Sequence, residues 1–317
     1  MASVTPPYIG RFAPSPTGPL HAGSLLAAVA SYLDAKAHQG QWLLRIEDVD
    51  RLRTVSGATD SILSTLEAHG LHWDGTVSYQ THNDGRYQAA LNQLARQQQV
   101  FYCDCTRAAL RQHGPAYPGF CRTRKSANYI NATRHQPASH AIRFEVGDTP
   151  VGFIDRILGS QDFSLAALGD FILRRRDSLF AYQLAVVVDD AEQGINHIVR
   201  GADLLPSTPW QIALQQALNL PQPQYAHLPL LIHADGKKLS KQTGARAVDD
   251  NQAGYNLCQV LMQLGQPIPK QAQQLPVAEL LQWAITHWQI KAVPNTNIAA
   301  NTSTHANTNA NSNVTSR

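Results

Sequence analysis

Two segments that lie far apart in the chain carry residues suited to phosphate chemistry. The first, Arg11–Ser24 (RFAPSPTGPLHAGS), joins a predicted strand to a predicted helix, which is the place where open α/β sheets bind nucleotides. Gly23 lets a phosphate or an adenine approach the backbone closely, and His21 stands beside a helix N-terminus whose free N–H groups attract anions. A proline-rich turn with a surface histidine is the simpler alternative, because a His-x-Gly pattern alone is weak support.

The second segment, His233–Gly244 (HADGKKLSKQTG), is a basic loop in which Lys238 and Lys241 lie on either side of Ser240. Transfer of AMP to a carboxylate expels pyrophosphate, and mobile cations that close over the phosphates stabilise the transition state. Lysine suits this role because its charge is compact and its stem is flexible. Taken alone, the segment also fits an ordinary solvated loop.

The order of these segments resembles that of the signature motifs of class I aminoacyl-tRNA synthetases, which are of the His-x-Gly-His and Lys-Met-Ser-Lys-Ser types. Ser24 departs from the second histidine, as is common in the glutamyl branch, and Leu239 and Gln242 depart from the lysine motif. The resemblance to the glutamyl branch extends from about residue 8 to residue 245. It is carried by Arg11–Gly18 (RFAPSPTG), Leu44–Asp50 (LRIEDVD), Gly70–Gly75 (GLHWDG), Phe180–Asp190 (FAYQLAVVVDD) and His197–Leu205 (HIVRGADLL).

The resemblance implies a site for glutamate and for ATP with Mg²⁺. Arg11 ends the first predicted strand and Arg200 follows a later one, which would place both at the carboxyl edge of the sheet. Arginine can grip a carboxylate with two parallel hydrogen bonds, and the resemblance assigns the side-chain carboxylate to Arg200 with help from Arg11. The other implied residues are Glu47 and Tyr182 for the α-ammonium, Ala13 and Ser15 for the pocket wall, His21, Gly23, Ser24 and Lys241 for ATP, and His21, Lys238 and Lys241 for catalysis.

These assignments have structural alternatives. Glu47 could belong to an acidic cluster near a helix start, where negative charge is favoured. Arg200 could form an ion pair with Asp203 or Asp189. A catalytically silent relative that binds RNA or reports glutamate is a further alternative, but the presence of all the motif residues gives it little support.

Three of the four cysteines, Cys103, Cys105 and Cys121, lie close together in the sequence. In a reducing compartment such a cluster indicates metal ligands rather than disulfides, and zinc in structural sites usually has four ligands, often thiolates. The cluster resembles the zinc-binding insertion found in part of the glutamyl branch, which implies Tyr117 as the fourth ligand. His113 is the conventional competitor, and inert buried thiols are the alternative without metal.

Alternating strand and helix patterns predict an α/β fold with a parallel sheet. The resemblance makes this a Rossmann-type sheet with an inserted mixed α/β subdomain that holds the zinc, followed by a short helical C-terminal region. The predicted strands are Tyr8–Phe12, Trp42–Ile46, Asp170–Leu173, Leu184–Val188 and Ile195–Val199. The predicted helices are Gly23–His38, Ser56–His69, Asp84–Gln99, Ser207–Leu218, Asn251–Leu264 and Val277–Trp288.

These patterns also divide the chain into successive units. Residues 1–100 form the first half of the catalytic domain, 101–170 the insertion, 171–245 the second half with the lysine loop, and 246–291 a helical region. Residues 292–317 are dominated by Asn, Thr, Ser and Ala. We expect this tail to be disordered, because it offers little apolar surface to bury.

Composition restricts the expected location of the protein and the partners that it could bind. Of the 317 residues, 43% are hydrophobic, and the net charge of +3 permits an RNA partner without arguing for one. No segment is apolar enough for a secretory signal or a membrane span, so we expect a cytoplasmic protein without a membrane partner, and a monomer.

The short stretch after Lys241 leaves no room for the helical anticodon-binding region of a full glutamyl-tRNA synthetase. The chain therefore resembles the short members of the branch, which place glutamate on queuosine, a modified base in the anticodon loop of tRNA(Asp). Activation of glutamate without tRNA is then expected. A truncated enzyme that charges the 3′ end of a tRNA is the alternative.

Overall fold

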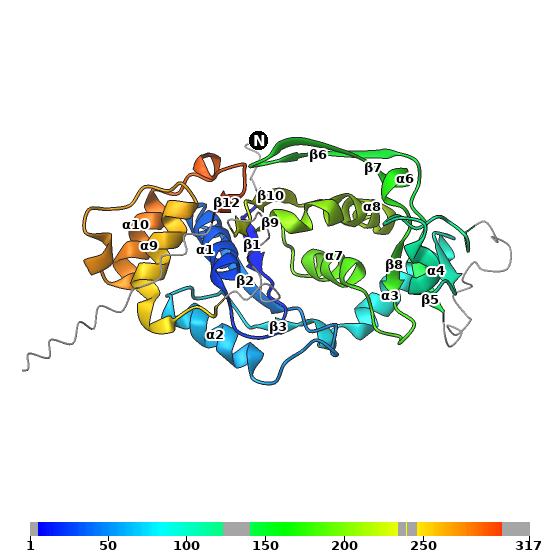
Figure 1. Ribbon diagram of the computed structural model, residues 1–317, viewed down its shortest axis with the longest axis horizontal. Helices are drawn as coiled ribbons and strands as arrows, with labels where there is room; N and C mark the ends of the chain where they lie inside the picture. The colour runs from blue at the N-terminus through cyan, green and yellow to red at the C-terminus, as the bar shows by residue number, and fades with distance from the viewer. Residues whose placement is uncertain (1–5, 123–139, 234–238, 240–245, 300–317) are drawn as a thin grey trace, which may run out of the picture.

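The computed structural model describes residues 6–122, 140–233, 239 and 246–299, and the molecule is elongated (Figure 1). Its strands are β1 (Ile9–Phe12), β2 (Gln41–Ile46), β3 (Ser78–Tyr79), β4 (Val100–Cys103), β5 (Ala141–Phe144), β6 (Pro150–Asp155), β7 (Gly159–Ser164), β8 (Phe171–Arg174), β9 (His197–Gly201), β10 (Gln224–Leu228), β11 (Leu231–Ile232) and β12 (Ile298–Ala299). Its α-helices are α1 (Ala22–Ala37), α2 (Ala58–Ala68), α3 (Asp84–Arg96), α4 (Arg107–Arg111), α6 (Leu165–Leu168), α7 (Tyr182–Glu192), α8 (Thr208–Leu218), α9 (Ala253–Gln263) and α10 (Val277–Thr286). Within the described ranges, none of these helices has the length and apolar character needed to cross a bilayer.

Parallel strands form the centre of the molecule. On one side β1 pairs with β2 and β2 pairs with β3. On the other side β9 pairs with β10, and β10 pairs with β6. All these pairings are parallel, whereas β7 is the antiparallel partner of β6 at the far edge. The α/β fold with a parallel sheet that the sequence predicts is confirmed.

The two halves of this sheet are joined through Asn196, the residue before β9. Its backbone N–H donates to the carbonyl of Ile9 (3.1 Å), and its side-chain oxygen accepts from the N–H of Ile9 (2.8 Å). The order in which successive strands are added to the sheet reverses at this junction, because β1 leads through α1 to β2 on one side and β9 leads through α8 to β10 on the other. Doubly wound sheets bind ligands at the carboxyl ends of the strands that flank such a junction.

Helix α1 covers this junction, since it packs against β1, β2 and β9. Its apolar residues recur at helical spacing, and Leu25, Leu26, Val29 and Leu33 are buried. A different group of helices, α3, α7 and α8, packs together beside the β9 half of the sheet (Figure 1).

The prediction of a strand at Leu184–Val188 is wrong, because these residues lie within α7. The run is rich in β-branched residues, and a short apolar run cannot be assigned to strand or helix by periodicity alone. Helix α7 packs against both α3 and α8, so four of these five residues, Leu184 to Val187, are buried. Burial on more than one face of the helix removes the amphipathic pattern that would have identified it.

A second sheet lies at one end of the molecule. It extends beyond the expected insertion at residues 101–170, because β4 begins at Val100 and β8 spans Phe171–Arg174. It contains three strands in the order β4-β5-β8, all antiparallel. Helices α9 and α10 lie at the opposite end (Figure 1) and pack against α1. The limits assigned to the units along the chain stay predictions.

The expected disorder of residues 292–317 is wrong for its first part. Val293 is buried in the core beside α9 and α10, and β12 pairs in parallel with β11, where Ile298 lies opposite Leu231. Composition misled the prediction because strand pairing uses backbone groups, which every residue carries, and because the few apolar residues of the segment, Val293 and Ile298, pack against the core. Residues 300–317 lie outside the described residues.

Candidate active site

A cavity of about 610 Å³ opens at the carboxyl ends of β1 and β9. It is lined by every described residue that the sequence assigns to glutamate or ATP. These residues are Arg11, Ala13, Ser15, His21, Gly23, Ser24, Glu47, Tyr182 and Arg200. The structure therefore brings the predicted residues into one site, while their individual roles stay predictions.

His21 is the N-cap residue of α1 and lines the cavity. Its Nδ1 accepts a hydrogen bond from the backbone N–H of Ser24 (3.3 Å), so the proton of a neutral ring lies on Nε2, which is 3.2 Å from Ser24 Oγ. A Cβ atom added to Gly23 would lie 3.2 Å from the His21 ring. Glycine thus keeps space at the helix N-terminus, where backbone N–H groups favour an anion.

The two sequence motifs meet at this cavity. Leu239, from the lysine loop, lines it, and the N–H of Leu239 donates to the carbonyl of Leu231 (2.7 Å). After the loop, the N–H of Val248 donates to the carbonyl of Leu20 (2.9 Å), one residue before His21. Leu239 within the loop and Val248 after it are therefore both hydrogen-bonded to residues that line the cavity. Lys238 and Lys241 lie outside the described residues, so their placement stays a prediction.

Arg200 is buried at the end of β9. Its Nη2 donates to Thr208 Oγ1 (2.9 Å) and its Nε donates to His227 Nε2 (3.2 Å), but its Nη1 is buried without a hydrogen-bond partner. The alternative, an ion pair with Asp203 or Asp189, is not found among the described residues. A buried, unpartnered donor of a cation in a cavity wall is suited to bind a carboxylate.

Arg11 is held by a network of buried charges. Its Nε donates to Asp190 (3.0 Å), and Asp190 also pairs with Arg45 Nη2 (2.8 Å). The same Arg45 nitrogen contacts Glu47 Oε1 (3.3 Å). The charges of Arg11 and Arg45 hold the pKa of Asp190 below its usual value, although burial alone would raise it. Sequence reasoning missed Arg45 and Asp190, which hold Arg11 and Glu47 in place from outside the cavity lining, although both lie in segments that resemble the glutamyl branch.

Glu47 and Tyr182 form the acceptor side of the cavity. Burial raises the pKa of Glu47, and the charges of Arg45 and Arg11 oppose this effect. Burial also raises the pKa of Tyr182, with the charge of Glu47 adding to it, so the phenol keeps its proton. The cavity thus joins a carboxylate and a phenol to the two guanidinium groups of Arg11 and Arg200. This pattern is complementary to an amino acid that carries an ammonium and two carboxylates.

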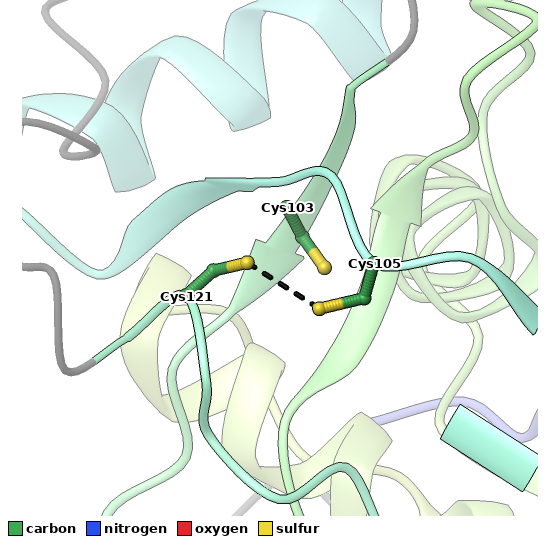
Figure 2. Close-up of side chains that lie close together, drawn as sticks. All are labelled: Cys103, Cys105 and Cys121. Atoms are coloured by element: carbon green, nitrogen blue, oxygen red, sulfur yellow. Dashed lines mark hydrogen bonds between the residues drawn. The ribbon is translucent and has the colours of Figure 1, made fainter. Parts of the chain in front are cut away.

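The clustered cysteines form a second group, outside the lining of this cavity. The sulfur atoms of Cys103, Cys105 and Cys121 point toward one another (Figure 2) and lie within 4.8 Å of one another, with 3.5 Å between Cys105 and Cys121. Tyr117 Oη lies 3.6 Å from Cys103 Sγ and 3.7 Å from Cys105 Sγ. Ligands of a tetrahedral zinc would be about 3.5–3.8 Å apart, given the usual zinc–ligand bond lengths. These residues could therefore hold a metal ion.

The two candidates for the fourth ligand, His113 and Tyr117, differ in their surroundings. His113 is exposed and its ring contacts Phe120 at 4.8 Å. Tyr117 is buried among the sulfur atoms, and the guanidinium of Arg143 lies over its ring (4.0 Å). Arg143 also donates to Cys103 Sγ (3.3 Å), and this interaction holds the pKa of Cys103 below its usual value against the effect of burial. The geometry favours Tyr117 over His113.

Comparison with known proteins identifies the class. The profile of the family described as tRNA synthetases class I (E and Q), catalytic domain, matches residues 9–282. The chain belongs to this family, and it is a ligase-type enzyme.

Individual similar proteins indicate which branch of this family the chain resembles. A protein of Idiomarina loihiensis named glutamyl-Q tRNA(Asp) synthetase is 51% identical over 285 residues, which are 89% of this chain and 96% of that protein. A protein of the same name from Methylococcus capsulatus is 50% identical, over 91% of this chain and 93% of that protein. A solved glutamate tRNA ligase from Elizabethkingia meningosepticum, in complex with its amino acid, has a TM-score of 0.77 and 26% identity; the match covers 92% of this chain and 66% of that chain.

The buried charge network predicts a large effect of Asp190→Asn on stability. This change would leave the guanidiniums of Arg11 and Arg45 without their shared carboxylate, which should lower the free energy of unfolding by about 3–5 kcal/mol. Glu192→Gln on the same helix is the control, because its ion pair with Arg86 is exposed and should contribute less than about 1 kcal/mol. Urea unfolding measures both. Equal effects of the two changes would contradict the importance of this network.

Proposed function

We propose that this protein activates glutamate with ATP and transfers it to the queuosine base in the anticodon loop of tRNA(Asp). Arg200 carries the first half of the proposal, because it lines the cavity and its Nη1 has no hydrogen-bond partner within the described residues. The second half is supported by the relatives named glutamyl-Q tRNA(Asp) synthetase, which match this chain over nearly their whole length.

In this proposal each side of the cavity meets one part of the substrate. Arg200, with Arg11, binds the side-chain carboxylate, and Glu47 and Tyr182 receive the α-ammonium. Ala13 and Ser15 line the pocket.

The α-carboxylate of glutamate then faces the N-terminus of α1, where His21, Gly23 and Ser24 contact ATP with its Mg²⁺. The α-carboxylate attacks the α-phosphate and expels pyrophosphate, and Lys238 and Lys241 supply positive charge to the phosphates.

Glutamate activation should not require tRNA. Pyrophosphate exchange with glutamate, ATP and Mg²⁺ measures the step directly. Arg200→Ala should lower kcat/KM for glutamate about 100- to 1000-fold, because a substrate carboxylate is left unpaired. Arg200→Lys should rescue only part of this loss, since lysine lacks the planar fork. Arg86→Ala, a change at an exposed arginine, is the control. Exchange that strictly requires tRNA would contradict the proposal.

The acceptor should be queuosine and not the terminal ribose. Glutamate transfer should occur on tRNA(Asp) that carries queuosine and on its isolated anticodon stem-loop. It should fail on tRNA from cells that cannot make queuosine, although the 3′ end of that tRNA is intact. Mapping of radiolabelled glutamate by nuclease digestion measures the outcome. Label on the terminal adenosine would replace this proposal with 3′-end charging by a truncated glutamyl-tRNA synthetase.

We propose zinc as the metal of the cysteine cluster, held by Cys103, Cys105, Cys121 and Tyr117. The donor set supports zinc, because thiolates are preferred ligands of this ion. A closed set of four protein ligands would leave no open position, so the metal would stabilise the fold of this end of the molecule and take no part in adenylation.

Metal analysis of protein purified without chelator should find one zinc per chain. Cys103→Ser should reduce the zinc content and the thermal stability together, because metal binding contributes to folding. Cys258→Ser, at the buried cysteine outside the cluster, should leave the zinc content unchanged. Tyr117→Phe should weaken zinc binding more than His113→Ala. A folded, active preparation without zinc would exclude this site.

A further inference from the structure

The guanidinium of Arg200 is held along one edge only. A guanidinium carries five N–H donors in a fixed plane, and Nε and Nη2 share one of its edges. In Arg200 that edge donates to His227 Nε2 and to Thr208 Oγ1, which lie 3.0 Å from each other. Nη1 and the second N–H of Nη2 form the next edge, and Nη1 has no partner. The unused edge belongs to a residue that lines the cavity.

His227 can accept from Arg200 only in one protonation state, and Asp155 selects that state. Asp155 Oδ2 lies 2.6 Å from His227 Nδ1. An ionised carboxylate can only accept, so Nδ1 must carry the proton, and the neutral ring then has its lone pair on Nε2, toward Arg200. If Nε2 of His227 also carried a proton, its N–H would meet the Nε–H of Arg200, and a charged ring would lie beside the charged guanidinium. Burial lowers the pKa of His227, and the charge of Arg200 adds to this effect, whereas Asp155 opposes it.

The surroundings hold this arrangement firmly. His227 and Asp155 are almost completely buried. Asp155 Oδ1 accepts from the backbone N–H groups of Ile157 and Leu158, both at 2.9 Å. The ring of Tyr225 stacks with that of His227 and lies 5.4 Å from the guanidinium of Arg200. These contacts fix the plane of the guanidinium, and Thr208 alone could fix only one of its atoms.

We propose that His227, oriented by Asp155, is a positioning residue that turns the Nη1–Nη2 edge of Arg200 toward the substrate and thereby makes the site selective for a carboxylate over a carboxamide. The proposal rests on glutamate being the amino acid that is activated. An edge that presents only donors pairs with both oxygens of a carboxylate, whereas a carboxamide offers one oxygen and an NH₂ group that meets N–H. Discrimination between glutamate and glutamine then depends on how rigidly this edge is held.

Three variants separate this role from simple packing. His227→Phe keeps a planar ring but removes the acceptor, and His227→Gln keeps an acceptor near the position of Nε2. Asp155→Asn is isosteric and keeps Oδ1 as acceptor for the backbone N–H groups of Ile157, Leu158 and His227, although the contact of Oδ2 with the His227 N–H is lost. Its amide, however, would donate to Nδ1 and move the ring proton to Nε2, against Arg200. His82→Gln, at an exposed histidine outside the cavity lining, is the control.

The readouts are the KM for glutamate, the KM for ATP and the ratio of kcat/KM for glutamate to that for glutamine, all from pyrophosphate exchange. His227→Phe and Asp155→Asn should raise the KM for glutamate about 10- to 100-fold, as expected for loss of a hydrogen bond to a charged group. Both should lower the glutamate-to-glutamine ratio, while the KM for ATP should stay nearly unchanged. His227→Gln should recover part of the loss.

Failure of this proposal and failure of the proposed function give different results. If the unaltered protein shows no exchange with glutamate, the proposed function and this inference are both overturned. If it is active, and Asp155→Asn keeps the unaltered KM and ratio, only the role of His227 is overturned. If His227→Phe does not fold, ¹⁵N NMR of the unaltered protein tests the proposal instead, because it shows which ring nitrogen of His227 carries the proton. A proton on Nδ1 of His227 supports the proposal, and a proton on Nε2 overturns it.

Discussion

Burying a guanidinium is costly where its charge is not balanced, and this cost organises the centre of the protein. Arg45 is completely buried and meets the carboxylates of Asp190 and Glu47, and Asp190 extends the network to Arg11. Arg200 is treated differently, because a neutral imidazole and a hydroxyl meet its donors. Its positive charge is therefore left for an incoming anion. Of the two buried arginines that line the cavity, Arg11 is thus paired with a carboxylate, whereas Arg200 has no carboxylate partner among the described residues.

The parallel sheet brings these groups together. Arg11 and Arg200 stand on β1 and β9, the two strands at which the chain order reverses, and α1 begins beside them. The carboxyl ends of parallel strands and the N-terminus of a helix meet at one place in such a junction. A site for an amino acid and a site for a nucleotide phosphate can thus share one cavity. The cysteine cluster lies in the region of the separate three-stranded sheet, outside the lining of this cavity.

Sequence patterns predicted those parts of the structure that depend on local or motif residues. The strand–loop–helix around His21 and the clustering of Cys103, Cys105 and Cys121 followed from the spacing of residues in the chain. The pairing of Asp155 with His227 could not be predicted, because it depends on which strands become neighbours. Leu184–Val188 was wrongly predicted as a strand, because a helix that is buried on more than one face lacks the periodic pattern of apolar residues that identifies a helix. The composition of residues 292–299 led to a wrong prediction of disorder, because hydrogen bonding between strand backbones does not depend on the side chains. Lys238 and Lys241 stay predictions from their motif.

The central claim is that the free edge of Arg200 receives the side-chain carboxylate of glutamate. A crystal structure with a non-hydrolysable glutamyl-adenylate analogue tests it most directly. The account predicts that both carboxylate oxygens accept from Nη1 and Nη2 of Arg200, that the ammonium lies between Glu47 and Tyr182, and that His227 keeps its contact with Nε. A side-chain carboxylate bound away from Arg200, or an Arg200 that leaves His227 to reach the ligand, would contradict it.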